Sequence, residues 1–122
     1  MNTTMRAVLG LLGLLVLTSA LRWIFDPSGA AAALGVTLPA GLGRSTIIGD
    51  LGAFFLAGAA FLFLAIFTAR AHWLWAAATL FGGAATMRTL AWALHGADFA
   101  AAFIAVEIVT AALLLFAASR LS

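Results

Sequence analysis

Long apolar stretches with few charged residues occupy most of this chain. A membrane-spanning helix needs roughly 20 consecutive, mostly apolar residues. Four stretches reach or approach that length, and they are predicted at residues 5–25, 46–69, 73–94 and 99–119. Because backbone polar groups in lipid must be hydrogen-bonded within their own segment, stretches of this length predict helices. None of them shows the two-residue alternation of a membrane β-strand.

The composition supports the same conclusion and excludes other classes. Hydrophobic residues make up 66% of the chain and charged residues 8%, whereas a soluble domain is about half apolar and about a quarter charged. The absence of cysteine excludes disulfides and thiolate metal sites. The basic residues are all arginines and are scattered singly, so nucleic-acid binding has no support. The abundance of Ala and Gly and the absence of Lys are typical of a GC-rich bacterial genome, and we expect a bacterial inner membrane protein.

The connection between the first two stretches predicts a short additional helix. Asp26 and Pro27 form a good N-cap and first-turn pair. Residues 30–34 can follow as helix, and Gly35 is a typical stop signal. The segment is too short to cross a membrane, so we expect it to lie at the interface or to fold back over the bundle.

The rest of that connection is predicted to be irregular. Pro39, Gly41 and Gly43 should break the chain, and Ser45 or Thr46 should cap the second spanning helix. The later connections, 70–72 and 95–98, are short and therefore imply antiparallel neighbours. The sequence thus predicts an all-α, integral membrane four-helix bundle in up-down-up-down order. Its single domain would cover residues 1–122, with a short interfacial helix between the first two spans.

Arginine placement predicts the orientation in the membrane. One side carries Arg6, Arg70 and Arg120, and the other carries Arg22 and Arg44 together with two aspartates. The positive-inside rule then places both termini in the cytoplasm.

The first stretch also has features of a cleavable signal peptide. A basic residue precedes an apolar run and then small residues, but the apolar character continues through Phe25. We therefore expect this stretch to be retained as a span.

Four charged residues near or within the spans form the candidate site. At about 1.5 Å per residue, Arg22, Asp50, Arg88 and Glu107 lie about 6, 8, 10 and 13 Å from the outer ends of their predicted helices. All four therefore fall in the outer half of the bilayer, each on a different helix. Thr18 precedes Arg22 by one turn and extends this cluster.

Three functions compete for this cluster. The first is binding or passage of a small polar or amphiphilic molecule, with Arg88 holding an anionic group. The second is a structural or partner-docking membrane subunit, in which the charges only clasp helices. The third is a small membrane enzyme that uses Glu107 or Asp50 as a general acid or base. An ion pair that only fixes the register of two helices needs one acid for one arginine. The presence of two acids, Asp50 and Glu107, near Arg88 therefore favours the binding hypothesis.

Other sites have weaker support in the sequence. Two carboxylates and a distant histidine lack the spacing of a metal site, and Arg88 would repel a cation, so no metal is expected. No nucleotide loop, haem attachment motif or catalytic serine pattern is present, so no cofactor and no catalytic residue are assigned. Small residues at 49, 53, 57 and 60 share one stripe of the second span. Such stripes permit close helix packing within the chain or, as an alternative, a homo-oligomer.

Short motifs also resemble a known family. Asp26-Pro27, the run from Leu34 to Pro39 and the run from Gly49 to Phe55 resemble the family of small bacterial four-span membrane proteins filed as domain of unknown function 4345. Arg88 and Glu107 also stand where that family carries an in-membrane arginine and glutamate. The resemblance covers nearly the whole chain. It implies a four-span helical fold in a membrane, and it implies no activity.

Overall fold

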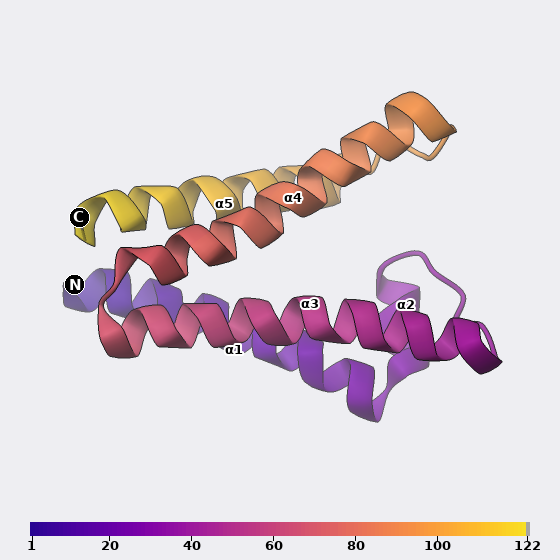
Figure 1. The fold of residues 1–122 in the computed structure, drawn as a ribbon, viewed down its shortest axis with the longest axis horizontal. Helices are drawn as coiled ribbons and strands as arrows, with labels where there is room; N and C mark the ends of the chain where they lie inside the picture. Colours follow the sequence, from indigo (N-terminus) through magenta and orange to yellow (C-terminus); the bar gives the residue numbers. More distant parts are fainter. Residues whose placement is uncertain (122) are drawn as a thin grey trace. The chain divides into compact units, whose positions relative to one another are not determined.

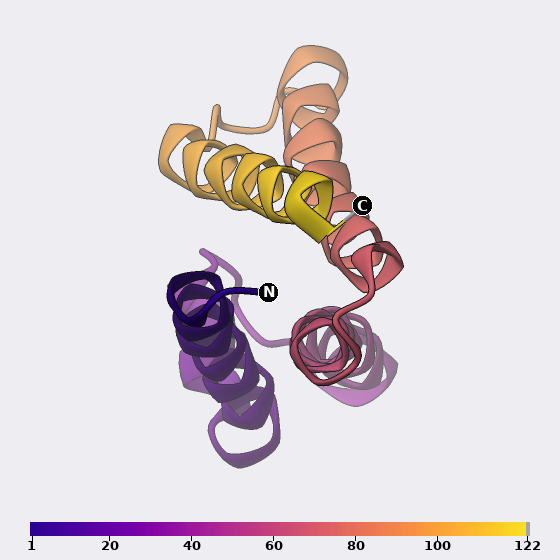
Figure 2. The ribbon, with the colours of Figure 1, turned by 90° about the vertical axis from the view of Figure 1, so that its left-hand side faces the viewer.

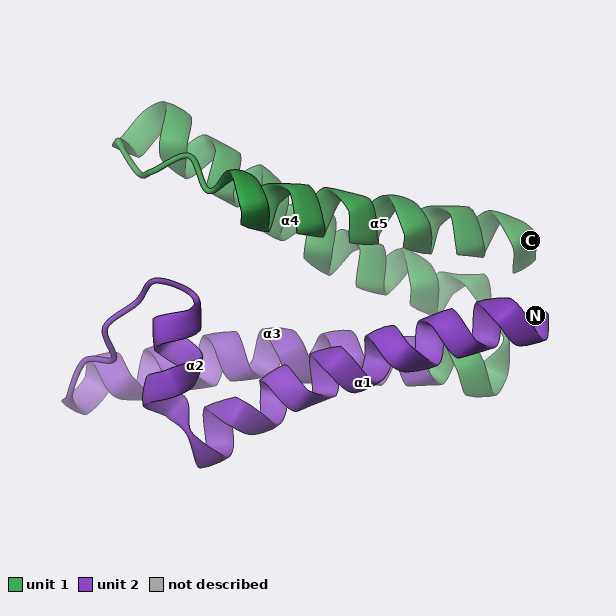
Figure 3. Cartoon of the chain, turned by 180° about the vertical axis from the view of Figure 1, so that it is seen from behind, with its two compact units in different colours: residues 1, 64–122 green, residues 2–63 purple. Residues whose placement is uncertain are grey.

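A computed structural model describes residues 1–121, which contain five helices and no strand (Figure 1). The helices are α1 (Thr3–Phe25), α2 (Pro27–Ala33), α3 (Gly41–Thr68), α4 (Ala71–His95) and α5 (Ala101–Leu121). The all-α prediction is confirmed. The chain divides into two compact units, one made of residues 2–63 and the other of residue 1 with residues from 64 onward (Figure 3).

Three helices, α1, α3 and α5, are long and apolar enough to cross a membrane. They also expose large apolar side chains, such as Leu15, Phe67 and Val109, each at least two-thirds exposed. Soluble monomers rarely expose apolar surface on this scale. Membrane location is therefore supported by both the sequence and the structure.

The prediction of a fourth apolar span was wrong for α4. Its 25 residues would reach about 37 Å and are long enough to cross a bilayer. Its composition is not apolar enough, because Arg88, His72, His95 and three threonines lower its mean hydropathy.

The N-terminal unit folds a short helix back against α1 and α3. The Asp26 side chain accepts a hydrogen bond from the Gly29 N–H at 3.1 Å, and Pro27 opens α2. Both the predicted cap and the predicted short helix are confirmed. Trp23, Ala30 and Ala31 are buried together, and partly buried apolar residues of the connection and of α3 pack against them.

The start of α3 differs from the prediction. The helix begins at Gly41, so the expected break through Gly43 and the cap at Ser45 or Thr46 were wrong. Arg44 Nε donates a hydrogen bond to the Pro39 carbonyl at 2.9 Å. This local contact ties the preceding proline to the first turn, so the helix starts earlier than the glycines indicated.

The stripe of small residues on α3 is largely exposed. Gly49, Ala53 and Ala60 are exposed, whereas the neighbouring Gly58 and Ala59 are buried. The buried face of α3 is therefore offset from the stripe that the sequence singled out.

The C-terminal unit is a hairpin in which α5 runs back along α4 (Figures 1 and 2). Gly96 ends α4 with a left-handed φ of 67°, which favours glycine because a side chain would be strained there. Its N–H and the N–H of Ala97 both donate to the Ala91 carbonyl. The rings of Trp92 and Phe99 pack edge to face across the turn, with centroids 5.0 Å apart.

The buried residues of each hairpin helix recur at helical spacing. On α4 and α5 they form one stripe each: Leu74, Ala77, Ala78, Phe81 and Ala85 on α4, and Ile104, Glu107, Leu114, Ala117 and Ala118 on α5. A side chain added at Gly82 would lie 3.8 Å from the Ala111 Cβ, so the two helices are close at mid-length. Glu107 is the one charged residue among these buried residues.

Candidate functional site

Arg88 and Glu107 are brought together by the α4–α5 hairpin. Arg88 follows Phe81 by seven residues and Ala85 by three, so it continues the buried stripe of α4. Glu107 follows Ile104 by three on the facing stripe of α5. The pairing of these two predicted site residues is thus a direct consequence of their positions on facing helix stripes.

The two side chains form an ion pair at short distance. Arg88 Nε lies 3.0 Å from Glu107 Oε1. Both atoms are shielded from solvent, yet neither has a hydrogen-bond partner among the described residues, because the Nε–H does not point along the line to the oxygen. The contact is therefore an electrostatic pair rather than an aligned hydrogen bond.

An aromatic ring adds to this pair. The guanidinium carbon of Arg88 lies 4.6 Å from the centroid of the Phe103 ring, within the range of a cation–π interaction. The Glu107 side chain is 12% exposed and that of Arg88 is 31% exposed. Removing one member of such a pair leaves an uncompensated buried charge, which costs about 3–5 kcal/mol.

Asp50 lies in α3 and belongs to the N-terminal unit. Its side chain is exposed, and no ion-pair partner lies beside it among the described residues of that unit. The joint cluster of Asp50 with Arg88 and Glu107 stays a prediction.

Arg22 has a different environment from Arg88. Its Nη2 lies 3.6 Å from Asp26 Oδ2, and the two side chains are 46% and 62% exposed. An exposed pair of this kind contributes about 0–1 kcal/mol. Because a guanidinium carries five N–H donors, this one long contact leaves most of its donors available.

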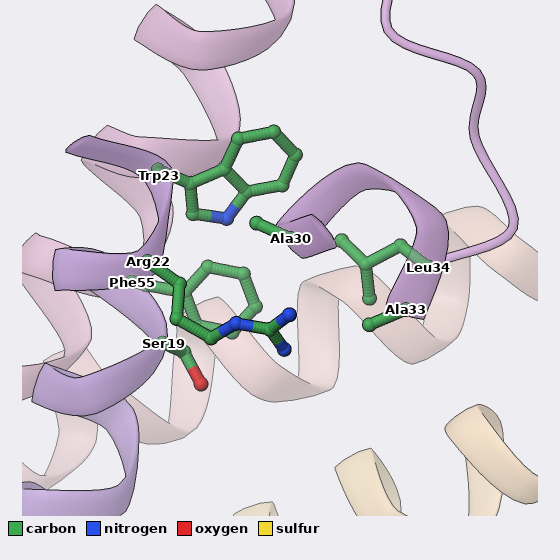
Figure 4. Close-up of a pocket in the computed structure, with 7 residues that line it drawn as sticks. All are labelled: Ser19, Arg22, Trp23, Ala30, Ala33, Leu34 and Phe55. Carbon is green, nitrogen blue, oxygen red and sulfur yellow. The ribbon is translucent and has the colours of Figure 1, made fainter. Parts of the chain in front are cut away.

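The Arg22 guanidinium lines a small cavity between α1, α2 and α3. The cavity has a volume of about 60 Å³. It is lined by Ser19, Arg22, Trp23, Ala30, Ala33, Leu34 and Phe55. Figure 4 shows Arg22 extended from α1 toward Ala33, with the Trp23 and Phe55 rings nearby. This volume holds a few water molecules or one small anionic group.

Gly29 makes room for the Arg22–Asp26 pair. A side chain at this position would collide with Asp26 Oδ2 and would lie 2.8 Å from Arg22 Nη2. Both charged groups therefore lie over the first turn of α2, and a larger residue at position 29 would require the Asp26 and Arg22 side chains to shift.

Thr18 is exposed, and its hydroxyl donates to the Leu14 carbonyl at 2.8 Å. The hydroxyl residue that lines the cavity is its neighbour Ser19. Sequence reasoning placed the polar neighbour on the same helix turn but one residue away from the one that faces the cavity.

Two contact residues were missed by the sequence analysis. Asp26 was interpreted only as a helix cap, although its position four residues after Arg22 is a typical ion-pair spacing. Phe103 stands four residues before Glu107, and the same spacing rule could have placed it beside the charge pair.

No group of three or more His, Cys, Asp or Glu side chains that could hold a metal ion occurs within residues 1–121. The two candidate polar sites are the Arg88–Glu107 pair and the Arg22 cavity.

Comparison of the chain with family models, with curated proteins and with solved structures found no match. The resemblance to domain of unknown function 4345 stays a prediction. The function of the chain is therefore inferred from its two polar sites.

Proposed function

We propose that this chain is a multi-pass membrane protein that binds an amphiphile with an anionic head, and that Arg22 holds that head. The single observation behind this proposal is the Arg22 cavity, in which a cation meets apolar walls. It keeps the binding function expected from the intramembrane charges. Of the two candidate arginines, Arg22 and Arg88, it assigns the ligand contact to Arg22, whose ion pair is the longer and more exposed one.

The charge of Arg22 supports an anionic head. Its only ion pair among the described residues is the 3.6 Å contact with an exposed carboxylate. A planar guanidinium can hold a carboxylate or a phosphate group through two parallel hydrogen bonds. Arg88 is less available for this role, because Glu107 and Phe103 already contact it.

The apolar residues beside Arg22 support an amphiphile as the ligand. Trp23, Leu34 and Phe55 line the same cavity as Arg22. Since the cavity has room only for the anionic head, the tail would extend from it into the lipid. Arg22 lies three residues from the end of α1, about 5 Å along the helix axis. This depth is that of the membrane–water interface, where lipid headgroups and amphipathic side chains gather.

The test is ligand retention by the purified protein. Native mass spectrometry would compare phosphatidylglycerol, phosphatidylcholine, a long-chain fatty acid and inorganic phosphate. We expect the two anionic amphiphiles to be retained over phosphatidylcholine, and inorganic phosphate to bind weakly because it lacks a tail. Arg22→Gln should weaken retention about tenfold or more, since hydrogen bonds to a charged group contribute about 1.5–3 kcal/mol.

Arg44→Gln is the matched control. Arg44 belongs to the same unit and is exposed, but it does not line the cavity. Equal retention by wild type and Arg22→Gln would overturn the proposal. Retention of inorganic phosphate as strong as that of the amphiphiles would overturn the assignment of an apolar tail.

The Arg88–Glu107 pair favours a second function for the other unit, that of a structural clasp. The pair is mostly buried and links the two hairpin helices directly. We infer that it fixes the register of α4 against α5, as expected of a membrane subunit whose charges are internal.

We further propose a bacterial inner membrane location with both termini in the cytoplasm and a four-helix arrangement in up-down-up-down order. Arg6, Arg70 and Arg120 support the orientation, since arginine is enriched on the cytoplasmic side. This arrangement requires α4 to cross the bilayer although its own composition is insufficient.

A further inference from the structure

We propose that α4 is a membrane crossing that inserts only as a hairpin with α5, and that Glu107 is the residue that makes this crossing stable. The inference concerns membrane insertion and is independent of the Arg22 ligand site. It starts from the contrast between α4, which is long enough to span but not apolar enough, and α5, which is both.

Arg88 is the principal obstacle to insertion of α4 alone. It lies seven residues before the end of α4 at His95, about 10 Å along the axis. A lone arginine at that depth would face hydrocarbon, where ionised side chains are disfavoured.

Glu107 stands at the matching depth on α5. It follows the start of α5 at Ala101 by six residues, about 9 Å along the axis from the same hairpin end. The two side chains therefore meet at one level, with Arg88 Nε and Glu107 Oε1 3.0 Å apart and both atoms shielded from solvent.

The rest of the hairpin covers most of this pair. Glu107 lies on the buried stripe of α5 with Ile104, and Arg88 follows the buried residues Phe81 and Ala85 on the facing side of α4 and is 31% exposed. Phe103 contacts the guanidinium. In the hairpin, Arg88 and Glu107 therefore neutralise each other between the two helices. If α4 inserted alone, Arg88 would be an unpaired cation in lipid.

The two partners have unequal roles in insertion. Without Arg88, α4 no longer carries the charged side chain that disfavours its insertion. The helix α5 is apolar enough to cross the membrane even with Glu107. Without Glu107, α4 keeps an unpaired arginine. We therefore expect Glu107→Leu to abolish the α4 crossing and Arg88→Leu to preserve it, whereas a simple clasp would respond equally to both changes.

The test measures the membrane topology of the chain by labelling introduced cysteines. The sequence has no cysteine, so each introduced one is the only labelling site. One cysteine is introduced by Ala97→Cys in the exposed turn between α4 and α5, and in a separate variant one is appended to the C-terminus. Intact cells are treated with a membrane-impermeant maleimide. In the wild-type background we expect the turn cysteine to be labelled and the C-terminal cysteine to be protected.

Glu107→Leu should reverse this pattern. We expect turn labelling to fall at least about tenfold and C-terminal labelling to rise, because α5 then crosses alone in the opposite direction. Arg88→Leu and the double change Arg88→Leu with Glu107→Leu should both keep the wild-type pattern. Asp50→Leu is the matched control, since it removes an acid from a spanning helix of the other unit.

If the Glu107→Leu variant is degraded in cells, the same labelling pattern is measured on protein synthesised in vitro in the presence of inner-membrane vesicles, where degradation does not remove the variant. An unchanged labelling pattern in Glu107→Leu would overturn the proposal. So would an Arg88→Leu variant that changes the pattern as much as Glu107→Leu does.

Discussion

The two units of this protein use their charged residues in opposite ways. The N-terminal unit buries an apolar centre of Trp23, Ala30 and Ala31 and leaves Arg22 and Asp26 about half exposed. The C-terminal unit places Arg88 and Glu107 on the facing stripes of its hairpin. An arginine in an apolar helix can thus stay available to a ligand, as Arg22 does beside Asp26, or be neutralised by an acid on a facing helix, as Arg88 is by Glu107.

The reason for the difference lies in the geometry of the acid. Asp26 is held by the backbone of α2 through the Gly29 N–H, so its second oxygen reaches Arg22 only at 3.6 Å. Glu107 has no such local tie among the described residues and approaches Arg88 to 3.0 Å. A carboxylate engaged as a helix cap is therefore the weaker partner for a cation.

The largest effect is expected when one member of the buried Arg88–Glu107 pair is removed. Arg88→Ala should destabilise the C-terminal unit by about 3–5 kcal/mol, because Glu107 is left as an uncompensated buried charge. The double change Arg88→Leu with Glu107→Leu should recover most of that loss. Unfolding in mixed micelles of increasing SDS content, followed by circular dichroism, measures both. A double variant as unstable as Arg88→Ala would contradict the clasp.

A second substitution tests the apolar centre of the N-terminal unit. Trp23→Ala should destabilise the N-terminal unit by about 3 kcal/mol, since it removes the largest buried side chain at the α1–α2 contact. No second substitution at a charged residue should rescue it, in contrast to Arg88→Ala. The same SDS titration measures the effect, and Trp92→Ala, at a half-exposed tryptophan, is the matched control. A loss no larger than that of Trp92→Ala would show that Trp23 does not hold this unit together.

The smallest expected effect concerns Asp26. Asp26→Asn removes the carboxylate that competes for Arg22 but keeps a side-chain oxygen that can cap α2. Retention of an anionic amphiphile should therefore rise several-fold, while stability changes by less than about 1 kcal/mol. Native mass spectrometry and the SDS titration provide the two readouts. Weaker retention in Asp26→Asn would mean that Asp26 positions Arg22 for the ligand rather than competing with it.

Local signals in the sequence were sufficient for several elements. Asp26, Pro27 and Gly35 predicted the short helix α2, because caps and stop signals act over a few residues. The same local reasoning was wrong at the start of α3. There the Arg44 contact with the Pro39 carbonyl, which neither residue type indicates by itself, moved the first turn to Gly41.

The helical, membrane-compatible character of the chain follows from the sequence alone, because hydropathy and helix signals are additive properties of consecutive residues. The sequence also identified Arg22, Arg88 and Glu107 as charges that need an explanation in apolar helices. The contacts that these charges make depend on the tertiary structure. Contact between Arg88 and Glu107 depends on the register of two helices, and the Arg22 cavity depends on α2 folding back over α1. Both features depend on how residues of separate helices are placed relative to each other, and the sequence of one helix alone does not specify that placement.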